Sequence, residues 1–175
     1  MKKTLLFLVT LTAGVYALPL TVANGMIKAH TEVFGDSSID PSTSKLVSHL
    51  SMDSDPQTLK GTIDISMTGL VSNNSARDEH MHEAIDSKKF KDASYAISHV
   101  TKNSKGYSIE GMLNFHGIER PLTIHADIFQ SGKSIHIGGH SSFLMSNYGV
   151  IPPKLLFLVV RDRVDITIDV NLNQM

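Results

Sequence analysis

The chain has 175 residues, a formal net charge of −1 with neutral histidines, and no cysteine. Without cysteine it forms no disulfide and carries no thiol-linked lipid, so its stability must come from its own core. The slight acidic surplus supplies no basic stripe of the kind that nucleic-acid-binding proteins use, which argues against a nucleic-acid partner.

The N-terminal segment has the pattern of a secretory signal peptide. A basic start, Met1–Lys3, is followed by an almost wholly apolar run, Leu5–Val15. The run is shorter than the about 20 residues of a membrane span, so we expect cleavage rather than anchoring. Cleavage is expected after Ala23, with cleavage after Ala17 as the alternative. The predicted boundaries are residues 1–23 for the signal peptide and 24–175 for one compact domain, which is exported to the periplasm or secreted.

Runs in which apolar and polar residues alternate predict eight β-strands. The clearest pair flanks Gly117, where two such runs are joined by a short connection that is typical of an antiparallel hairpin. Each run has one apolar face, as expected of a strand that covers a core. In chain order, the predicted strands cover residues 27–33, 46–52, 61–67, 93–98, 107–115, 122–128, 135–143 and 164–172.

Two segments are expected to be helical and to cover the sheet rather than form a layer of their own. Asn74 or Ser75 can cap a helix over residues 76–85, in which Met81 and Ile85 share one face. The segment Pro152–Leu158 begins with two prolines and predicts one or two apolar helical turns.

Eight antiparallel strands with one apolar face each can close into a barrel, which removes exposed edges, or fold into two packed sheets. We favour the closed barrel, whose interior is just wide enough to be filled by side chains or to hold one small ligand. Outer-membrane barrels carry aromatic girdles, and this chain has no tryptophan and only 6% aromatic residues, so a soluble barrel is expected.

The inward-facing residues predict an aliphatic lumen. Gly61, Gly111 and Gly139 fall in the same inward positions, where they would leave room for a thin ligand. A core that is filled by side chains gives the same alternation, so periodicity alone leaves both interpretations open. The residues predicted to line the lumen are Ile63, Ile65, Met67, Met81, Ile85, Tyr95, Ile97, Ile109, Leu113, Phe115, Leu122, Ile124, Phe143, Ile166 and Ile168.

Three groups of motifs, which together cover about Leu59 to Leu172, resemble the YceI-like family of exported bacterial proteins. The motifs are Arg77–Met81 followed by Phe90 and Ala93–Ile97, then Gly111–Gly117 running into Arg120–Leu122, and last Ser146–Pro153. They occur in the order in which the family has them. The N-terminal third matches the family's pattern less closely.

The resemblance implies an all-β fold, an eight-stranded antiparallel lipocalin-like barrel with a short α-helix covering one end. It also implies that the lumen binds a long-chain apolar lipid, a polyisoprenoid or a fatty-acid derivative, for transport in the periplasm. Each buried methylene contributes about 0.8 kcal/mol, so a chain of well over ten carbons is needed to exceed the cost of association. The alternative is an envelope structural or interaction protein with a filled core and no ligand.

Four residues are candidates for the mouth of the barrel and a lipid head group: Arg77, Asp78, His80 and Tyr148. Arg77 or His80 could donate a hydrogen bond to a head group. In the alternative interpretation, Arg77 and Asp78 pair with neighbouring strands and only hold the helix in place, a role in which exposed ion pairs contribute little energy.

Neither a metal site nor an active site is expected. Of the nine histidines, His80 and His82 form the one close pair, and residues two apart on a helix diverge. There is no nucleophilic cysteine, no G-x-S-x-G motif, no phosphate-binding loop and no H-E-x-x-H motif, so we expect a protein without cofactor that is not an enzyme.

The apolar segment Leu155–Val160 is a candidate contact surface. It could act as a lid, as a homodimer contact or as an edge that touches a membrane transiently. The sequence does not distinguish these three.

Overall fold

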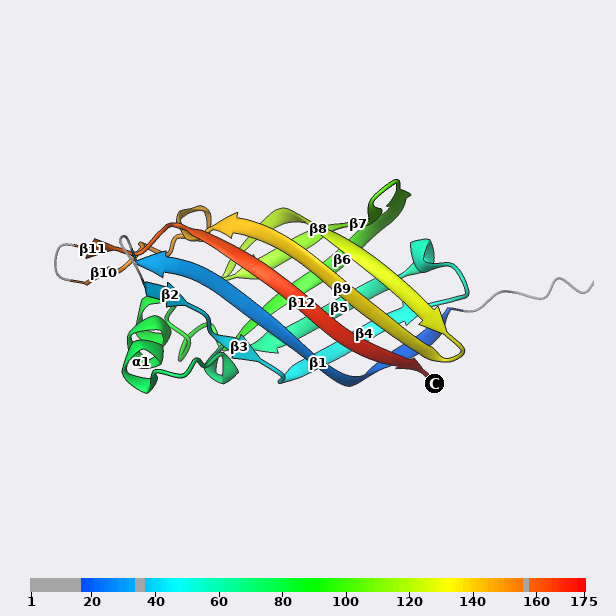
Figure 1. Cartoon of the computed structure of the whole chain (residues 1–175), viewed down its shortest axis with the longest axis horizontal. Coiled ribbons are helices and arrows are strands. Elements are labelled where there is room, and N and C mark those ends of the chain that lie inside the picture. Colours follow the sequence, from blue (N-terminus) through cyan, green and yellow to red (C-terminus); the bar gives the residue numbers. More distant parts are fainter. Residues whose placement is uncertain (1–16, 34–36, 156–157) are drawn as a thin grey trace, which may run out of the picture.

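The computed structural model describes residues 17–33, 37–155 and 158–175, and most of the predicted signal peptide lies outside these ranges. Eight long antiparallel strands close into a barrel in the order β12-β9-β8-β7-β6-β5-β4-β1, with β1 paired to β12 (Figure 1). The predicted closed barrel is thereby confirmed. The strands are β1 (Leu18–Val33), β4 (Leu46–Met52), β5 (Lys60–Ser66), β6 (Asp92–Asn103), β7 (Gly106–Phe115), β8 (Ile118–Ser131), β9 (Ser134–Leu144) and β12 (Arg163–Gln174).

Shorter elements lie between these strands. They are β2 (Ser37–Ile39) and β3 (Ser42–Thr43), which pair with β1, the 3-10 turns η1 (Pro56–Thr58), η2 (Met67–Gly69) and η3 (Met145–Tyr148), the helix α1 (Ser75–Ala84), and β10 (Lys154–Leu155) with β11 (Leu158–Val159). The expected helix is confirmed to within one residue at each end. Its N-cap is Asn74, whose side-chain oxygen accepts a hydrogen bond from the amide of Arg77.

The helical turns expected over Pro152–Leu158 are wrong, because the described residues of this segment form the hairpin β10–β11. Pro153 disfavours the α conformation at the residue before it. The amide of Val160 donates to the carbonyl of Pro153 at 3.0 Å, and Val160 also bridges to Val33 at the end of β1. The segment therefore gains sheet partners that a helix would forgo.

Two strands contain an extra residue that reverses which positions face inward. In β1 the register against β12 shifts between Val22 and Asn24, and in β6 the register against β7 shifts between Ile97 and His99. A bulge of this kind moves the following residues by one position, to the opposite face. Val100 consequently points inward and is almost completely buried.

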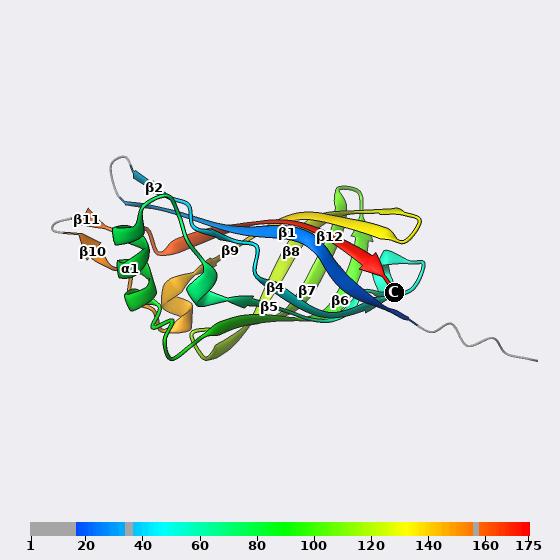
Figure 2. The same ribbon diagram turned by 90° about the horizontal axis from the view of Figure 1, so that it is seen from below.

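The two ends of the barrel are built differently (Figures 1 and 2). One end, called the helix end below, carries α1 and the β10–β11 hairpin. The other, called the closed end, carries η1, the β8–β9 turn and the C-terminus, and there Met52, Ile135 and Leu172 have no solvent exposure. Among the described residues, no helix has the length and apolar character to cross a membrane.

Candidate functional site

The barrel encloses a cavity of about 640 Å³ with almost entirely apolar walls. This volume lies within the range of about 300–1,000 Å³ that is usual for small-molecule sites. All fifteen residues predicted to line the lumen lie on its wall. The rest of the apolar lining is made by Ile27, Ala29, Ile39, Pro41, Leu50, Leu59, Leu70, Ala84, Ala93, Ile137, Met145, Pro153, Val160, Val164, Val170 and Leu172.

The wall is built from inward-facing partners on neighbouring strands. Ile63 on β5 lies opposite Tyr95 on β6, which in turn lies opposite Leu113 on β7. Two residues further along β6, Ile97 lies opposite Gly111 on β7, which lies opposite Leu122 on β8. Because such partners share one face of the sheet, their side chains form continuous apolar rows around the lumen.

The space beside Gly111 is occupied by other atoms of the protein. A Cβ at this position would collide with the carbonyl oxygen of Ala96 and lie 2.7 Å from Cζ of Tyr95, so the glycine makes room for the neighbouring strand and for the Tyr95 ring. The Tyr95 hydroxyl donates toward the carbonyls of Ile109 at 2.9 Å and Leu122 at 3.0 Å. Burial, reinforced by the negative charge of Glu110, raises the pKa of Tyr95, which keeps the phenol neutral.

Gly61 and Gly139 also serve strand packing. Gly61 has a φ of +114°, and a Cβ there would collide with the carbonyl oxygen of His49 on the neighbouring strand. At Gly139 a Cβ would lie 3.1 Å from Cβ of Ala126. The expectation that the three inward glycines leave room for a ligand is therefore corrected, because each admits a neighbouring strand or side chain.

The mouth of the cavity lies at the helix end and is polar. Arg77, His80 and Glu83 line it from α1, His30 lines it from β1 and Lys154 from β10. Sequence reasoning missed His30, Glu83 and Lys154, because no local pattern links these three segments.

Arg77 is held by a hydrogen bond to β2, whereas His80 lies beside Glu83 at the surface. Nη1 of Arg77 donates to the carbonyl of Ser38 on β2 at 2.8 Å. Nδ1 of His80 lies 3.6 Å from Oε2 of Glu83, and both of these side chains are largely exposed. Arg77 thus ties the helix to the barrel wall, and its side chain still lines the opening.

The other two predicted mouth residues do not line the cavity. Asp78 is buried, and its carboxylate accepts hydrogen bonds from the amide of Ser72 at 2.8 Å and the Ser72 hydroxyl at 2.6 Å. Tyr148 is buried with its ring centroid 5.6 Å from that of Phe115 and 5.1 Å from that of Phe143. Burial raises the pKa of Tyr148, against a smaller opposing effect of Arg120. Both residues hold the helix end together rather than face a ligand.

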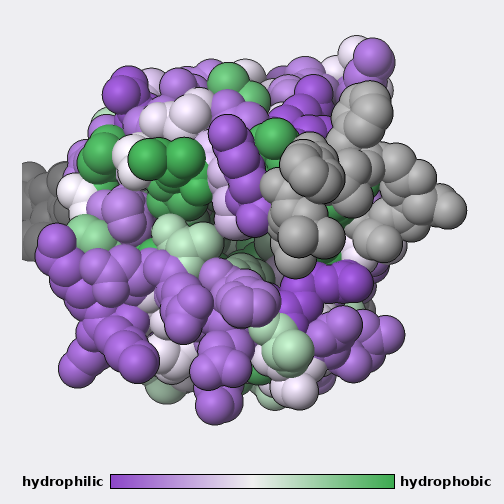
Figure 3. Space-filling view, turned by 90° about the vertical axis from the view of Figure 1, so that its left-hand side faces the viewer, coloured by the Kyte–Doolittle hydropathy of each residue, from purple (hydrophilic) through white to green (hydrophobic). Residues whose placement is uncertain are grey.

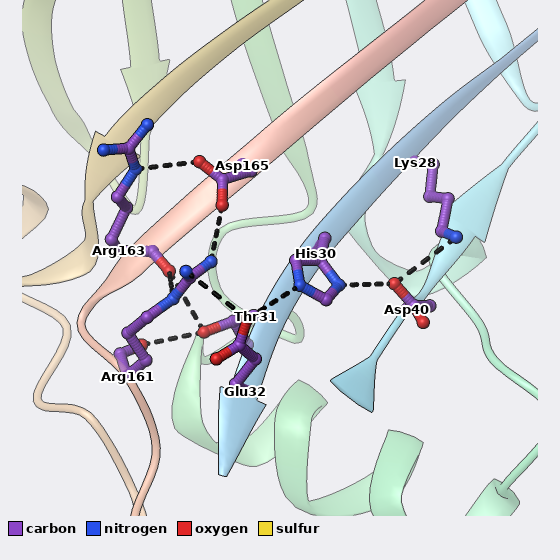
Figure 4. Close-up of polar contacts among 8 residues, drawn as sticks. All are labelled: Lys28, His30, Thr31, Glu32, Asp40, Arg161, Arg163 and Asp165. Atoms are coloured by element: carbon purple, nitrogen blue, oxygen red, sulfur yellow. Dashed lines mark hydrogen bonds and ion pairs between the residues drawn. The ribbon is translucent and has the colours of Figure 1, made fainter. Parts of the chain in front are cut away.

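A polar network crosses the outside of the closing seam between β1 and β12 near the mouth (Figure 4). Nδ1 of His30 lies 2.7 Å from Oδ1 of Asp40, and Nε2 of His30 lies 3.2 Å from Oε1 of Glu32. Arg161 joins Glu32, with 3.5 Å between Nη1 and Oε1, to Asp165, with 2.5 Å between Nη2 and Oδ2. The network fastens β1 to the segment that enters β12.

The hydrogen bond between His30 and Asp40 changes the pKa of both groups. The contact with Asp40 raises the pKa of His30 above its ordinary 6.5, with burial opposing and Glu32 assisting. The contact with His30 lowers the pKa of Asp40 below its ordinary 3.8. Within the described part of the chain, no three His, Asp or Glu side chains converge as metal ligands would.

A family model described as a YceI-like domain matches residues 22–172. Among curated proteins, UPF0312 proteins of Serratia proteamaculans and Pseudomonas fluorescens are 29% and 32% identical over 91 residues. These matches cover 51% and 50% of this chain and 47% of each relative, so they span about half the length of these relatives.

Several solved structures have the same fold. BcnA of Burkholderia cenocepacia superposes with a TM-score of 0.74 at 15% identity, over 84% of this chain and 95% of its own. A domain from Saccharophagus degradans, described as polyisoprenoid binding and implicated in plant cell wall breakdown, gives 0.63 at 11% identity, over 90% and 99%. A YceI protein of Campylobacter jejuni gives 0.56 at 13% identity, over 100% and 99%. At these identities the likeness concerns the fold.

Proposed function

The chain belongs to the YceI-like family, and from this premise we propose that it is a carrier that binds a long-chain apolar lipid inside the barrel. The observation that carries the proposal is the cavity of about 640 Å³, whose wall is almost entirely apolar and whose charged side chains lie at its mouth. The polyisoprenoid-binding description of the Saccharophagus degradans domain supports a polyisoprenoid or a fatty-acid derivative as the class of ligand.

The energetics of burial favour a long chain. About twenty methylenes buried in the lumen would contribute about 16 kcal/mol, from which association subtracts about 4–15 kcal/mol. About ten methylenes would leave little or no net affinity. Arg77 and His80, which line the mouth, are the residues proposed to meet the head group.

Binding without catalysis is the activity that we propose. Catalysis needs several polar groups that converge on one point of a substrate. Of the polar side chains on the cavity wall, Tyr95 and Ser141 are each hydrogen-bonded to backbone carbonyls, Ser141 to that of Thr123 at 2.7 Å. The others, such as Arg77 and Glu83, gather at the mouth.

We propose that the carrier works in the periplasm, or outside the cell, after removal of a signal peptide at Ala17 rather than at Ala23. Leu18 and Leu20 pair with Met52 and Leu50 of β4, and Leu20 is buried in the core of the closed end. Cleavage after Ala23 would remove these contacts. N-terminal sequencing of the exported protein distinguishes the two sites.

The test is native mass spectrometry of the protein exported to a bacterial periplasm and purified without detergent, followed by organic extraction. We expect a stoichiometric adduct that releases a molecule with a long apolar tail. Ile97→Trp, which adds bulk at the cavity wall, should reduce the adduct, whereas Val47→Trp at an exposed position on β4 should leave it intact. An empty protein that takes up neither isoprenoid nor fatty-acyl probes would favour an envelope interaction protein instead.

A further inference from the structure

The surface beside the cavity mouth carries an apolar pair next to a lysine. Ile151 is 84% exposed and Val159 is 44% exposed. Val159 is the cross-strand partner of Lys154 in the β10–β11 hairpin, so the two side chains share one face. Ile151, Lys154 and Val159 are called the hairpin patch below.

The hairpin patch is continuous with the opening of the cavity. Pro153 and Lys154 belong to the cavity wall, and the hairpin projects beyond α1 at the helix end in both ribbon views (Figures 1 and 2). Figure 3 looks onto this end and shows apolar surface in the middle of a mostly hydrophilic face. A body that covered the patch would therefore also cover the mouth.

The patch stands on a fixed base. Val150 and Val160 flank it in the chain and are buried in the core of the helix end. The amide of Val160 donates to the carbonyl of Pro153, which closes the base of the hairpin. The exposed apolar side chains are thus presented by an anchored element, and their exposure is not relieved by packing against the barrel.

The choice of a binding partner for the hairpin patch follows from the apolar character of the proposed lipid ligand, and it therefore rests on the proposed function. Each methylene that leaves the lumen for water weakens its binding about fourfold, so a long chain needs a continuous apolar path out of the barrel. A bilayer supplies that path, because its hydrocarbon lies a few ångströms below its head groups. Aliphatic side chains next to a lysine suit this boundary, since the lysine reaches lipid phosphates while its neighbours insert.

We propose that the hairpin patch docks the helix end onto a lipid bilayer, with Ile151 and Val159 inserted and Lys154 at the phosphates, so that the cavity opens toward the hydrocarbon. Anionic lipid strengthens this contact through the charge of Lys154.

The test is flotation of the exported, processed protein with vesicles of phosphatidylcholine alone or of phosphatidylcholine mixed with phosphatidylglycerol. Ile151→Asp combined with Val159→Asp should lower partition at least about tenfold on both kinds of vesicle, because it removes two insertable side chains. Lys154→Glu should lower partition about fivefold or more on the anionic vesicles only. Phe129→Asp, at a 64% exposed apolar position on β8 near the β8–β9 turn of the closed end, is the matched control and should change nothing.

Equal partition of the double variant and the unmodified protein would overturn the proposal, as would an equal loss caused by Phe129→Asp. Ile151→Ser, outside the strands, gives a second readout should the double variant fail to fold. Lipid content by extraction is measured in parallel. Protein that carries lipid yet ignores both kinds of vesicle overturns docking alone and points to a protein partner, whereas protein that binds vesicles but never holds lipid overturns the proposed function alone.

Discussion

The two ends of the barrel differ in what joins the strands. At the closed end the connections are short, as in the β8–β9 turn, and side chains such as Ile135 and Leu172 have no solvent exposure. At the helix end longer segments, 67–91 between β5 and β6 and 145–162 between β9 and β12, cover the opening. The alternating pattern determines the barrel wall between the two ends, while the inserted segments supply α1 and β10, which carry most of the charged side chains at the mouth.

The largest effect on the free energy of unfolding should come from truncating a core side chain at the closed end. Leu172→Ala removes a completely buried side chain and should lower the free energy of unfolding by about 2–5 kcal/mol. Met81→Ala removes a partly buried side chain of α1 that faces the cavity, so the loss should be below about 2 kcal/mol. Urea denaturation of the lipid-free variants measures both, and equal losses would mean that the two ends are packed alike.

The next largest effect on stability should come from removing the hydrogen bonds between α1 and the segment before it. Asp78→Ala leaves the half-buried amide and hydroxyl of Ser72 without their acceptor, at a cost of about 1–3 kcal/mol. Glu79→Ala, at the exposed neighbouring position, is the control. Hydrogen exchange should rise for the amides of α1 in the Asp78 variant and stay slow for those of β12. Faster exchange at both ends would show that the helix end does not open independently.

A smaller effect is expected at Tyr95, inside the core of the closed end. Tyr95→Phe keeps the ring that occupies the space beside Gly111 and removes the hydrogen bonds to the carbonyls of Ile109 and Leu122. The free energy of unfolding should fall by about 0.5–1.5 kcal/mol. Tyr107→Phe removes a hydroxyl that bonds to none of the described residues, so thermal melts of this variant should match the unmodified protein.

The wall of the barrel could be predicted because it depends on a local pattern. Alternation identified eight strands, and all fifteen residues predicted for the lumen lie on the cavity wall. The pattern fails where one extra residue reverses it, as near Ser98, after which Val100 turns inward. No composition signal marks that bulge, because the strand simply continues with His99.

The mouth could be predicted only in part, because its contacts join segments that lie far apart in the chain. Arg161 bonds to Glu32 across 129 positions, and no spacing rule links them. Tyr148 was assigned to the mouth by its place in a motif, yet its ring packs between Phe115 and Phe143. A tyrosine in a turn can face solvent or core, and the choice depends on neighbours that the sequence does not identify.

The smallest effect tests whether pH acts on one end alone. The pKa of His30 is raised by Asp40, so the stability from this contact is fully present below the ordinary pKa of 6.5 and is lost as pH rises through the higher folded-state value. The pKa of Asp40 is lowered, so the contribution of Asp40 is lost as pH falls through its folded-state value, below 3.8. Both side chains are about one-third exposed, so the contribution should stay below about 1 kcal/mol.

Asp40→Asn removes this contact together with the ion pair between Asp40 and Lys28 at 3.4 Å, while Glu32 and Arg161, the other charged groups at His30, are unchanged. The variant should return the pKa of His30, measured by NMR titration, toward 6.5. It should lose more stability relative to the unmodified protein near pH 6 than near pH 8.5, where the Lys28–Asp40 pair is still lost but the contribution of His30 has declined. The protection factors of α1 amides in the unmodified protein, which correct for the intrinsic rise of exchange with pH, should fall over the same interval, while those of β12 amides near Leu172 stay constant. A pKa of His30 that is the same in both proteins would contradict the assignment. Protection factors that fall equally at both ends would show that the seam network stabilises the whole barrel rather than its mouth.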